Sequence, residues 1–396
     1  MTKIFIPIEI SAREFEWKKS LAKICQDQGY AVILGYKPLV QELALSDNQG
    51  IYLDKGYHPI QSDKLYKKLK KKKFTIISID EEGAIDWNNG CSLATRYPPK
   101  LTDLIDYIFL WGKQQKFLYY NNCDKALITG HPRFNLKKNI INKRNIISEK
   151  NNKILIVTNA SFGNNKQGRE AVLSRYKSRI NNLNEILDLD IKKVGAVNAV
   201  LSIIPKNISV ILRIHPEECT SSYVGVEENI EFSSKSLSED LQSCNTVLHF
   251  DSTVAIDAIR FNADVITMIK LISDPNSPFV CGLPVLISDY ALNDYDEIQK
   301  ILRENKTFPE KEKYKIIEDY FYETNMFDFS NELIKCINDN HINKKSLSFK
   351  QYLIIFKFYL NIIFGRIDKI SLAKYFSHFG NTKSIIDKMK RILIEI

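Results

Sequence analysis

The sequence predicts an α/β protein made of two doubly wound domains that face a central cleft, with a helical C-terminal region. Short apolar runs of strand type alternate with helix-like stretches in two separate series. A segment rich in Asn and Lys divides the two series, and 396 residues are too many for one core. We therefore expect an N-terminal domain over 1–133, a linker over 134–152, a second domain over 153–310 and a helical region over 311–396.

The first series opens with an apolar strand at residues 3–10. An amphipathic helix follows over 11–25, and Gly29 ends it, because glycine readily adopts the left-handed conformation found after helices. Further strand-like runs lie at 30–36, 51–53, 74–79, 105–110 and 126–129. Strands that alternate with helices form a parallel sheet covered on both faces.

The second series has strand-like runs at 153–159, 209–214, 246–250 and 264–269, with a long helical region at 166–204. Beyond about residue 285 the pattern is helical. The apolar stretch at 351–364 is shorter than the roughly twenty residues of a membrane span, and a basic stretch follows it. This region either packs into the core through its apolar stripe or lies on the surface of a membrane.

Composition excludes several classes of function. The net charge of +9 comes without an arginine-rich arm, zinc-ligand spacing or an aromatic-basic repeat, so we expect no nucleic acid partner. The seven cysteines are scattered and include no C-x-x-C pair, as in reduced cytosolic proteins. The first strand begins without a basic leader, so no secretory signal is expected. We predict a cytoplasmic protein, in peripheral contact with the inner face of the membrane.

Chemically active side chains follow the strand-like run that begins at Val210. Arg213, His215 and Glu217 come at its carboxyl end, where open parallel sheets bind ligands, and Pro216 stops the strand. The alternative is a histidine at a strand end without a ligand.

A second strand-like run, at residues 246–250, leads into Ser252 and Thr253 and then a helix-like pattern. Either residue would cap the helix, whose free N–H groups and dipole suit a phosphate. Most helix starts of this type bind nothing. We nevertheless expect a phosphate site, because these residues and His215 would fall on neighbouring strands.

An acidic turn, Asp80–Gly83, directly follows the strand-like run at 75–79. Clustered carboxylates repel one another, so we expect one of Asp80, Glu81 and Glu82 to hold its proton more tightly than a lone carboxyl, as a general base requires. The alternative is a solvated turn in which Gly83 supplies a positive φ. The Asp-x-Asp pairs at Asp188 and Asp294 lack a strand-end context, and we assign no metal to them.

Four segments resemble the bacterial surface carbohydrate biosynthesis proteins encoded with capsule and O-antigen genes. They are Ile6–Phe15, Asp54–Gly56, Ser78–Gly83 and Thr129–Phe134. The resemblance covers mainly the first domain. The last segment holds a second His-Pro pair, which we interpret as a structural turn or part of the cleft edge.

Three short motifs, in their order along the chain, resemble those of bacterial sialyltransferases and related Kdo transferases. They are Glu81-Glu82-Gly83, His215-Pro216 and Ser252-Thr253. The resemblance implies a GT-B fold, a CMP-activated 3-deoxy-ulosonic acid donor (sialic or pseudaminic type, or Kdo), and no metal or other cofactor. It also implies that one carboxylate of the acidic motif is catalytic. The choice between Glu81 and Glu82 stays open, and Asp80 adds a third candidate.

By the same resemblance, His215, Ser252 and Thr253 would hold the CMP phosphate. Such a donor carries a phosphate and a carboxylate, so Arg213 and His215 suit its charge, within a turn that also contains Pro216 and Glu217. We assign Glu9 and Arg13 to a glycan or lipid-linked glycan acceptor. The sequence does not choose between inversion, with a carboxylate as base, and retention, with a carboxylate as nucleophile.

Two other readings of the sequence remain. One is a CDP-glycerol-type polyol-phosphate transferase or a nucleotide-sugar epimerase, since both reactions are served by paired Rossmann-like domains. The other is a non-catalytic scaffold in a polysaccharide assembly complex, docked through the C-terminal region.

Overall fold

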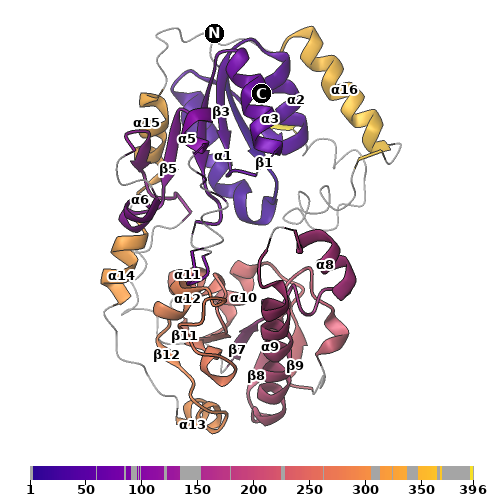
Figure 1. Ribbon diagram of the computed structural model, residues 1–396, viewed down its shortest axis with the longest axis vertical. Helices are drawn as coiled ribbons and strands as arrows, with labels where there is room; N and C mark the ends of the chain where they lie inside the picture. Colours follow the sequence, from indigo (N-terminus) through magenta and orange to yellow (C-terminus); the bar gives the residue numbers. More distant parts are fainter. Residues whose placement is uncertain are drawn as a thin grey trace. The chain divides into compact units, whose positions relative to one another are not determined.

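Two compact α/β units make up the protein (Figure 1). The computed structural model describes residues 3–58, 60–83, 86–90, 96, 98, 100–119, 123–133, 153–178, 180–223, 228–261, 263–304, 313–322, 324–336, 347–363, 366–367 and 393–395. Unit 1 contains residues 1–83, 94–135 and 319–396, and unit 2 contains 84–93 and 136–318. The predicted linker over 134–152 lies outside the described residues.

Unit 1 is built on a seven-stranded sheet in the order β13-β2-β1-β3-β4-β5-β6. The strands are β1 (Lys3–Ile8), β2 (Ala31–Tyr36), β3 (Gly50–Asp54), β4 (Phe74–Ile79), β5 (Tyr107–Leu110), β6 (Ala126–Ile128) and β13 (Leu393–Glu395). All are parallel except β13, which pairs antiparallel with β2. The strand order reverses between β1 and β3, and such a switch point is where open α/β sheets bind ligands.

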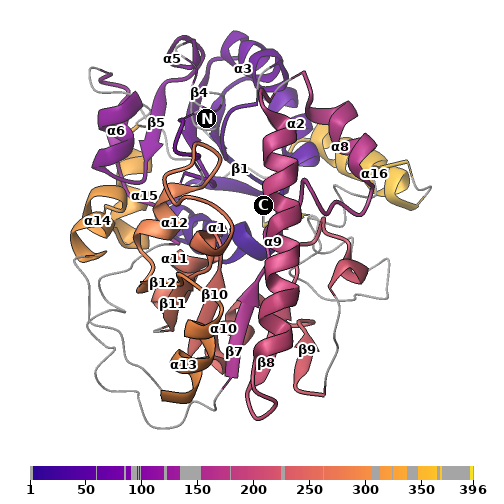
Figure 2. The ribbon, with the colours of Figure 1, turned by 60° about the horizontal axis from the view of Figure 1, so that its bottom comes forward.

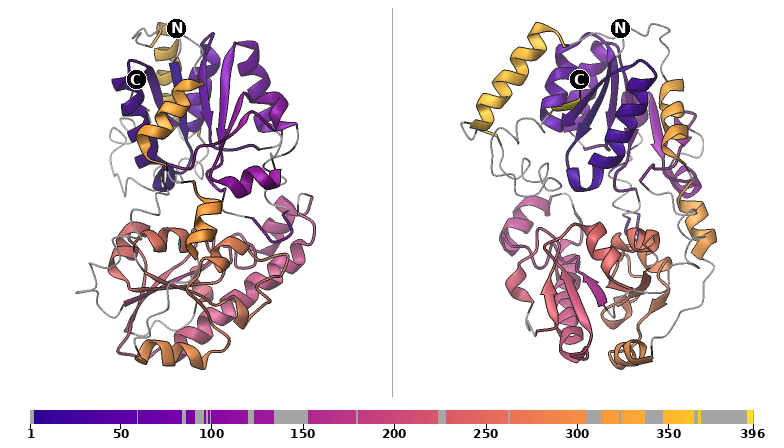
Figure 3. Two further views of the ribbon diagram at one scale, coloured as in Figure 1. Left: turned by 90° about the vertical axis from the view of Figure 1, so that its left-hand side faces the viewer. Right: turned by 180° about the vertical axis from the view of Figure 1, so that it is seen from behind.

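Helices cover the sheet of unit 1 (Figure 3). They are α1 (Ser11–Asp27), α2 (Lys37–Ser46), α3 (Gln61–Lys71), α5 (Leu101–Leu104), α6 (Lys113–Tyr119), α15 (Met326–Lys335) and α16 (Phe349–Ile363). From the C-terminal region, α15 packs against α1 and α16 packs against α2. As predicted, Gly29 follows α1 with a φ of +94°.

Unit 2 is built on a six-stranded parallel sheet in the order β12-β11-β10-β7-β8-β9. The strands are β7 (Lys153–Val157), β8 (Ser209–Arg213), β9 (Ile230–Phe232), β10 (Thr246–His249), β11 (Asp264–Thr267) and β12 (Tyr290–Ala291). Numbered within the unit, this is the 3-2-1-4-5-6 order of dinucleotide-binding Rossmann folds. Its switch point lies between β7 and β10.

The helices of unit 2 include one long element, α9, which runs beside β7 and β8 (Figure 2). They are α8 (Arg169–Tyr176), α9 (Leu183–Ile203), η2 (Thr220–Ser222), α10 (Leu237–Ser243), α11 (Val254–Arg260), η3 (Ile269–Leu271), α12 (Gly282–Leu286) and α13 (Asp296–Glu304). The segment 86–90 also belongs here, because Trp87 forms a β-bridge with Cys281. α14 (Lys313–Tyr320) spans the return of the chain to unit 1.

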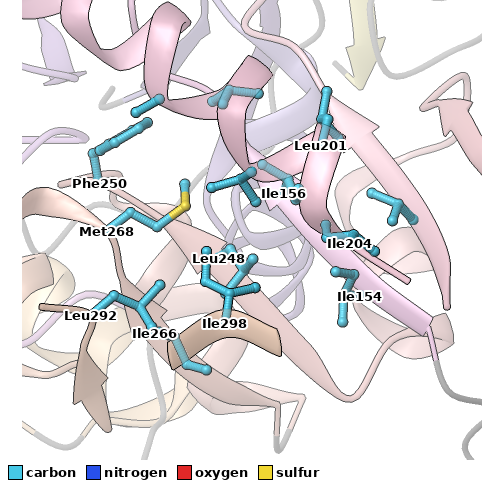
Figure 4. Close-up of a cluster of buried hydrophobic side chains, with 14 of the residues drawn as sticks. Ile154, Ile156, Leu201, Ile204, Leu248, Phe250, Ile266, Met268, Leu292 and Ile298 are labelled. Atoms are coloured by element: carbon cyan, nitrogen blue, oxygen red, sulfur yellow. The ribbon is translucent and has the colours of Figure 1, made fainter. Parts of the chain in front are cut away.

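The core of unit 2 lies between the sheet and α9 (Figure 4). Strand residues such as Ile156 and Leu248 meet Leu201 and Ile204 near the end of α9. These side chains are buried because α9 directs an apolar stripe of helical spacing at the sheet. The packing fixes the strands whose carboxyl ends form the site described below.

The predicted fold class is confirmed: two Rossmann-like units, with a C-terminal part that is mainly helical. Three short strands, β9, β12 and β13, were not predicted. The helical region at 166–204 is two helices, α8 and α9, and Asn182 precedes α9 in the left-handed conformation. Among the described helices, none is long and apolar enough to cross a membrane.

Candidate functional site

The acidic turn after β4 is held by hydrogen bonds along its whole length. The N–H of Glu81 donates to the carbonyl oxygen of Lys55 (3.1 Å), and the N–H of Glu82 donates to Asp80 Oδ1 (2.9 Å). Arg96 donates from Nε to Asp80 Oδ2 (3.0 Å) and from Nη2 to the carbonyl oxygen of Glu82 (2.9 Å). Asp80 is therefore a structural anchor of the turn, with its carboxylate oxygens already bonded.

Gly83 ends the turn for a reason other than the predicted one. It does not have a positive φ. A Cβ at this position would lie 2.6 Å from Gln115 Nε2 and 2.8 Å from the Trp111 ring. Both neighbours bind the turn, since Gln115 Nε2 donates to the Gly83 carbonyl oxygen (3.1 Å) and Trp111 Nε1 donates to that of Asp80 (2.6 Å). Close approach, and not backbone conformation, requires glycine here.

Glu81 is completely buried and lies between two basic side chains. Its Oε1 is 3.4 Å from Lys18 Nζ and its Oε2 is 3.3 Å from His131 Nε2. Lys18 Nζ also donates to Glu14 Oε2 (2.8 Å). Burial by itself would raise the pKa of Glu81, but Lys18, His131 and Arg13 lower it well below its ordinary value. Glu81 is thus a buried, ionised carboxylate.

His131 belongs to the second His-Pro pair, and its ring is buried, as the interpretation of that pair as a structural turn expects. Its Nδ1 accepts the N–H of Arg133 (3.2 Å), which places the ring proton on Nε2, facing Glu81. Burial lowers the pKa of His131, although the neighbouring Glu81 acts to raise it. The rings of Trp17 and Trp111 each lie 5.0 Å from it. Sequence analysis missed this partner of the acidic motif.

Glu82 is the accessible carboxylate of the motif, with 39% of its side chain exposed. Arg13 Nη1 donates to Glu82 Oε1 (3.2 Å). Burial would raise the pKa of Glu82, but Arg13, Lys55 and Arg96 lower it. The expected raised pKa is therefore wrong for both Glu81 and Glu82, because nearby cations outweigh the repulsion among the carboxylates.

Glu9 follows β1 at the switch point and belongs to the same cluster. Its Oε2 lies 3.2 Å from Lys37 Nζ and 3.3 Å from Lys55 Nζ. Burial would raise the pKa of Glu9, but Lys55 and Lys37 lower it from 4.5 to about 2. Glu9 and Arg13, which sequence analysis assigned to the acceptor, thus lie at the same edge of the sheet as the acidic turn.

In unit 2, the turn after β8 presents an exposed histidine ring. The backbone N–H of His215 donates to Thr158 Oγ1 (3.0 Å), and its Nδ1 accepts the N–H of Glu217 (3.3 Å). The proton of a neutral ring therefore resides on Nε2. Lys166 Nζ fixes the turn further by donating to the carbonyl oxygen of Pro216 (2.7 Å). The arrangement places the ring, with its Nε2–H, at the carboxyl edge of the sheet.

Arg213 does not supply a spare cation to this edge. Its Nη1 donates to Asp240 Oδ2 (2.6 Å), to Ser233 Oγ (3.1 Å) and to the carbonyl oxygen of Lys235 (3.0 Å). These groups follow β9 or lie on α10, on the far side of β8 from β7. The charge of Arg213 is therefore matched by Asp240.

Ser252 and Thr253 follow β10, and the expectation that they and His215 lie on neighbouring strands is wrong. β7 separates β8 from β10 in the sheet. Thr253 is the N-cap of α11, one of the two residues predicted, but its side chain makes no capping bond. Ser252 Oγ instead accepts the N–H of Val254 (3.3 Å). α11 has only seven residues, so its N-terminus is a weak source of dipole.

A buried ion pair underlies this edge and was missed by sequence analysis. Lys193 Nζ, from α9, lies 2.9 Å from Asp251 Oδ1 and 3.3 Å from Asp190 Oδ1. Asn159 Nδ2, after β7, donates to Asp251 Oδ1 (2.6 Å), and the N–H of Cys281 donates to Asp251 Oδ2 (3.0 Å). The lysine ties the ends of β7 and β10 together across the switch point. Within the described residues there is no cluster suited to a metal ion.

Comparisons with known proteins give a likeness of fold only. No protein-family model matches the sequence, and no curated protein matches it. The structure of S. aureus MnaA with UDP is similar at a TM-score of 0.47 and 9% identity, covering 87% of this chain and all of that one (100%). A UDP-GlcNAc 2-epimerase of Methanocaldococcus jannaschii is similar at a TM-score of 0.47 and 11% identity, covering 84% of this chain and 98% of that one.

The wall teichoic acid polymerase TagF gives a TM-score of 0.49 and 13% identity, covering 84% of this chain and 89% of that one. Scores and identities of this size assign no donor or reaction to the chain. The resemblance to surface carbohydrate biosynthesis proteins and CMP-ulosonate transferases therefore stays a prediction.

The ion pairs of Glu9 predict a specific pH dependence. A carboxylate whose pKa is lowered on folding adds stability above its ordinary pKa and loses it as the pH falls toward the folded value. Folding lowers the pKa of Glu9 from 4.5 to about 2. Glu9→Gln should therefore reduce the difference in stability between neutral pH and the pH range between these two pKa values. Denaturant unfolding at several pH values across this range measures the free energy of unfolding of each variant. The exposed Glu16→Gln is the control, and equal pH profiles for both variants would contradict the prediction.

Proposed function

We propose that this chain is a glycosyltransferase that moves a 3-deoxy-ulosonic acid from its CMP-activated donor onto a glycan acceptor of the bacterial surface. The observation that carries the proposal is Glu82, a partly exposed and ionised carboxylate at the carboxyl edge of a Rossmann-like sheet. Its turn is held by Asp80 and Arg96, so the carboxylate is positioned before a substrate arrives. Reduced cysteines among the described residues suit a cytoplasmic enzyme.

Glu82, and not Glu81 or Asp80, is the catalytic carboxylate in this proposal. A catalytic group must reach the reacting atoms, and the Glu81 side chain is fully buried. Both oxygens of Asp80 are engaged by Arg96 and the N–H of Glu82. Glu81 acts as a positioning residue: its negative charge holds Lys18 and His131 beneath the turn.

The donor is assigned to unit 2. His215, after β8, carries a ring N–H, and Ser252 and Thr253, after β10, carry hydroxyl groups, on either side of the end of β7. A phosphate accepts hydrogen bonds from donors of these kinds. Because Nδ1 of His215 is an acceptor, the ring can donate from Nε2 without an added proton. Arg213 supports the turn through Asp240 in this scheme.

The reaction exchanges one bond for another. The bond between the anomeric carbon and the phosphate oxygen breaks, CMP leaves with its electron pair, and the acceptor oxygen bonds to the anomeric carbon. Glu82 takes the proton of the acceptor hydroxyl in an inverting reaction. In a retaining reaction the same carboxylate attacks the anomeric carbon first as CMP leaves. The acceptor oxygen then displaces the carboxylate and gives its proton to the phosphate of CMP. Arg13 keeps Glu82 ionised for either role.

CMP should stabilise the folded protein, whereas UMP and UDP should not. A ligand that binds only the native state adds about 2.7 kcal/mol at a hundredfold excess over its Kd. Thermal unfolding with each nucleotide measures the effect. His215→Ala is the matched variant, because the side chain is exposed and should lose the CMP response without losing the fold. No response of the wild type to millimolar CMP would contradict the proposed donor.

Glu82→Gln should lower sugar transfer by about 10²–10⁴, because the amide keeps the shape of the side chain but cannot accept the proton. CMP affinity should change little. Glu81→Gln should instead lower the free energy of unfolding, because it removes the charge between Lys18 and His131. Transfer rate, CMP affinity and unfolding are measured on the same preparations. Near-normal transfer by Glu82→Gln would exclude it as the catalytic group, with Glu9 the next candidate at that edge.

A further inference from the structure

Helix α16 is packed on unit 1 through one side only. Its inner side faces α2 and carries Gln351, Ile355 and Phe358, which are 1%, 8% and 7% exposed. The Phe358 ring lies 5.7 Å from that of Tyr36, and Gln351 Nε2 donates to Asp47 Oδ2 (3.2 Å). These contacts fix which side of the helix faces outward.

The opposite side of α16 is apolar and exposed. Phe349, Tyr352, Leu353 and Phe356 are 78%, 52%, 52% and 61% exposed. Their spacing of three and four residues places them on one stripe, which we call the outer face of α16. Figures 1 and 3 show the helix at the outside of unit 1. Single exposed apolar residues are common, but four in one helical stripe indicate an interaction surface.

The two charged residues of α16 are both lysines. Lys350 and Lys357 are exposed on the helix itself. The sequence has no Asp or Glu from Lys344 to Ile367, and in residues 344–396 eleven Lys and Arg stand against three Asp and Glu. Most of the net charge of +9 therefore falls in this last part of the chain. The partner of the outer face must be both apolar and negatively charged.

We propose that the outer face of α16 lies on an anionic lipid surface. The aromatic and aliphatic side chains enter the boundary between headgroups and acyl chains, and Lys350 and Lys357 meet lipid phosphates. A second copy of the chain fits less well, because a self-complementary contact would bring the same lysines together. The inference does not depend on the proposed donor, since its test measures binding and not activity.

Co-sedimentation of the full-length protein with vesicles tests the proposal. Binding is expected to vesicles of phosphatidylcholine with phosphatidylglycerol, and to be weaker with phosphatidylcholine alone or at high salt. Phe349→Ser and Phe356→Ser should each weaken binding by roughly fivefold or more. Lys350→Gln and Lys357→Gln should each weaken it by roughly fivefold. Phe117→Ser is the control, because Phe117 is also an exposed phenylalanine (67%) but lies on α6.

Three results would overturn the proposal. One is the absence of wild-type binding to the anionic vesicles at low salt. Another is equal binding by the α16 variants and the wild type. The third is a lipid-free dimer, detected by light scattering, that Phe349→Ser and Phe356→Ser dissociate while Phe117→Ser does not. That result would assign the outer face to a second copy of the chain.

Discussion

The contact between Glu81 and its two buried partners, Lys18 and His131, is the constraint on which unit 1 depends. Removing one member of a buried ion pair typically costs about 3–5 kcal/mol, because the remaining charge has no solvent. Lys18 comes from α1, Glu81 from the turn after β4 and His131 from the turn after β6, so one charge cluster ties three separate segments together. This cluster holds the acidic turn in place, and Glu82 is the carboxylate of the motif that reaches solvent.

Unit 2 uses the same principle at its own switch point. Lys193 from α9 joins Asp251, after β10, and Asn159 completes the link from the end of β7. In each unit a lysine from a helix is buried at the carboxyl edge of the sheet, where an unpaired charge would be costly. Glu82 in one unit and His215 in the other are at least partly exposed, and the backbone N–H of each donates a hydrogen bond that holds its turn. A preorganised site is expected to combine buried ion pairs, which hold the backbone, with reactive groups that reach solvent.

The architecture could be predicted well because the spacing of apolar residues and the positions of glycines are local features of the sequence. The principal strands of both sheets and the helix ended by Gly29 follow from them. Short edge strands such as β9 and β12 carry too few residues to show a period. The site was only half visible, since Glu82 and His215 stand in motifs, whereas Lys18 and Lys193 are single lysines on helices. Sheet order also has no local signal, which is why β7 was not expected between β8 and β10.

The most direct test of the proposed activity is a donor panel, with products identified by mass spectrometry. The purified full-length protein is incubated with a CMP-ulosonate, CDP-glycerol and a UDP-sugar, each with and without a glycan acceptor. The proposed function predicts release of CMP from the CMP-ulosonate and no turnover of the other two. Consumption of CDP-glycerol or the UDP-sugar, with the CMP-ulosonate left intact, would contradict it.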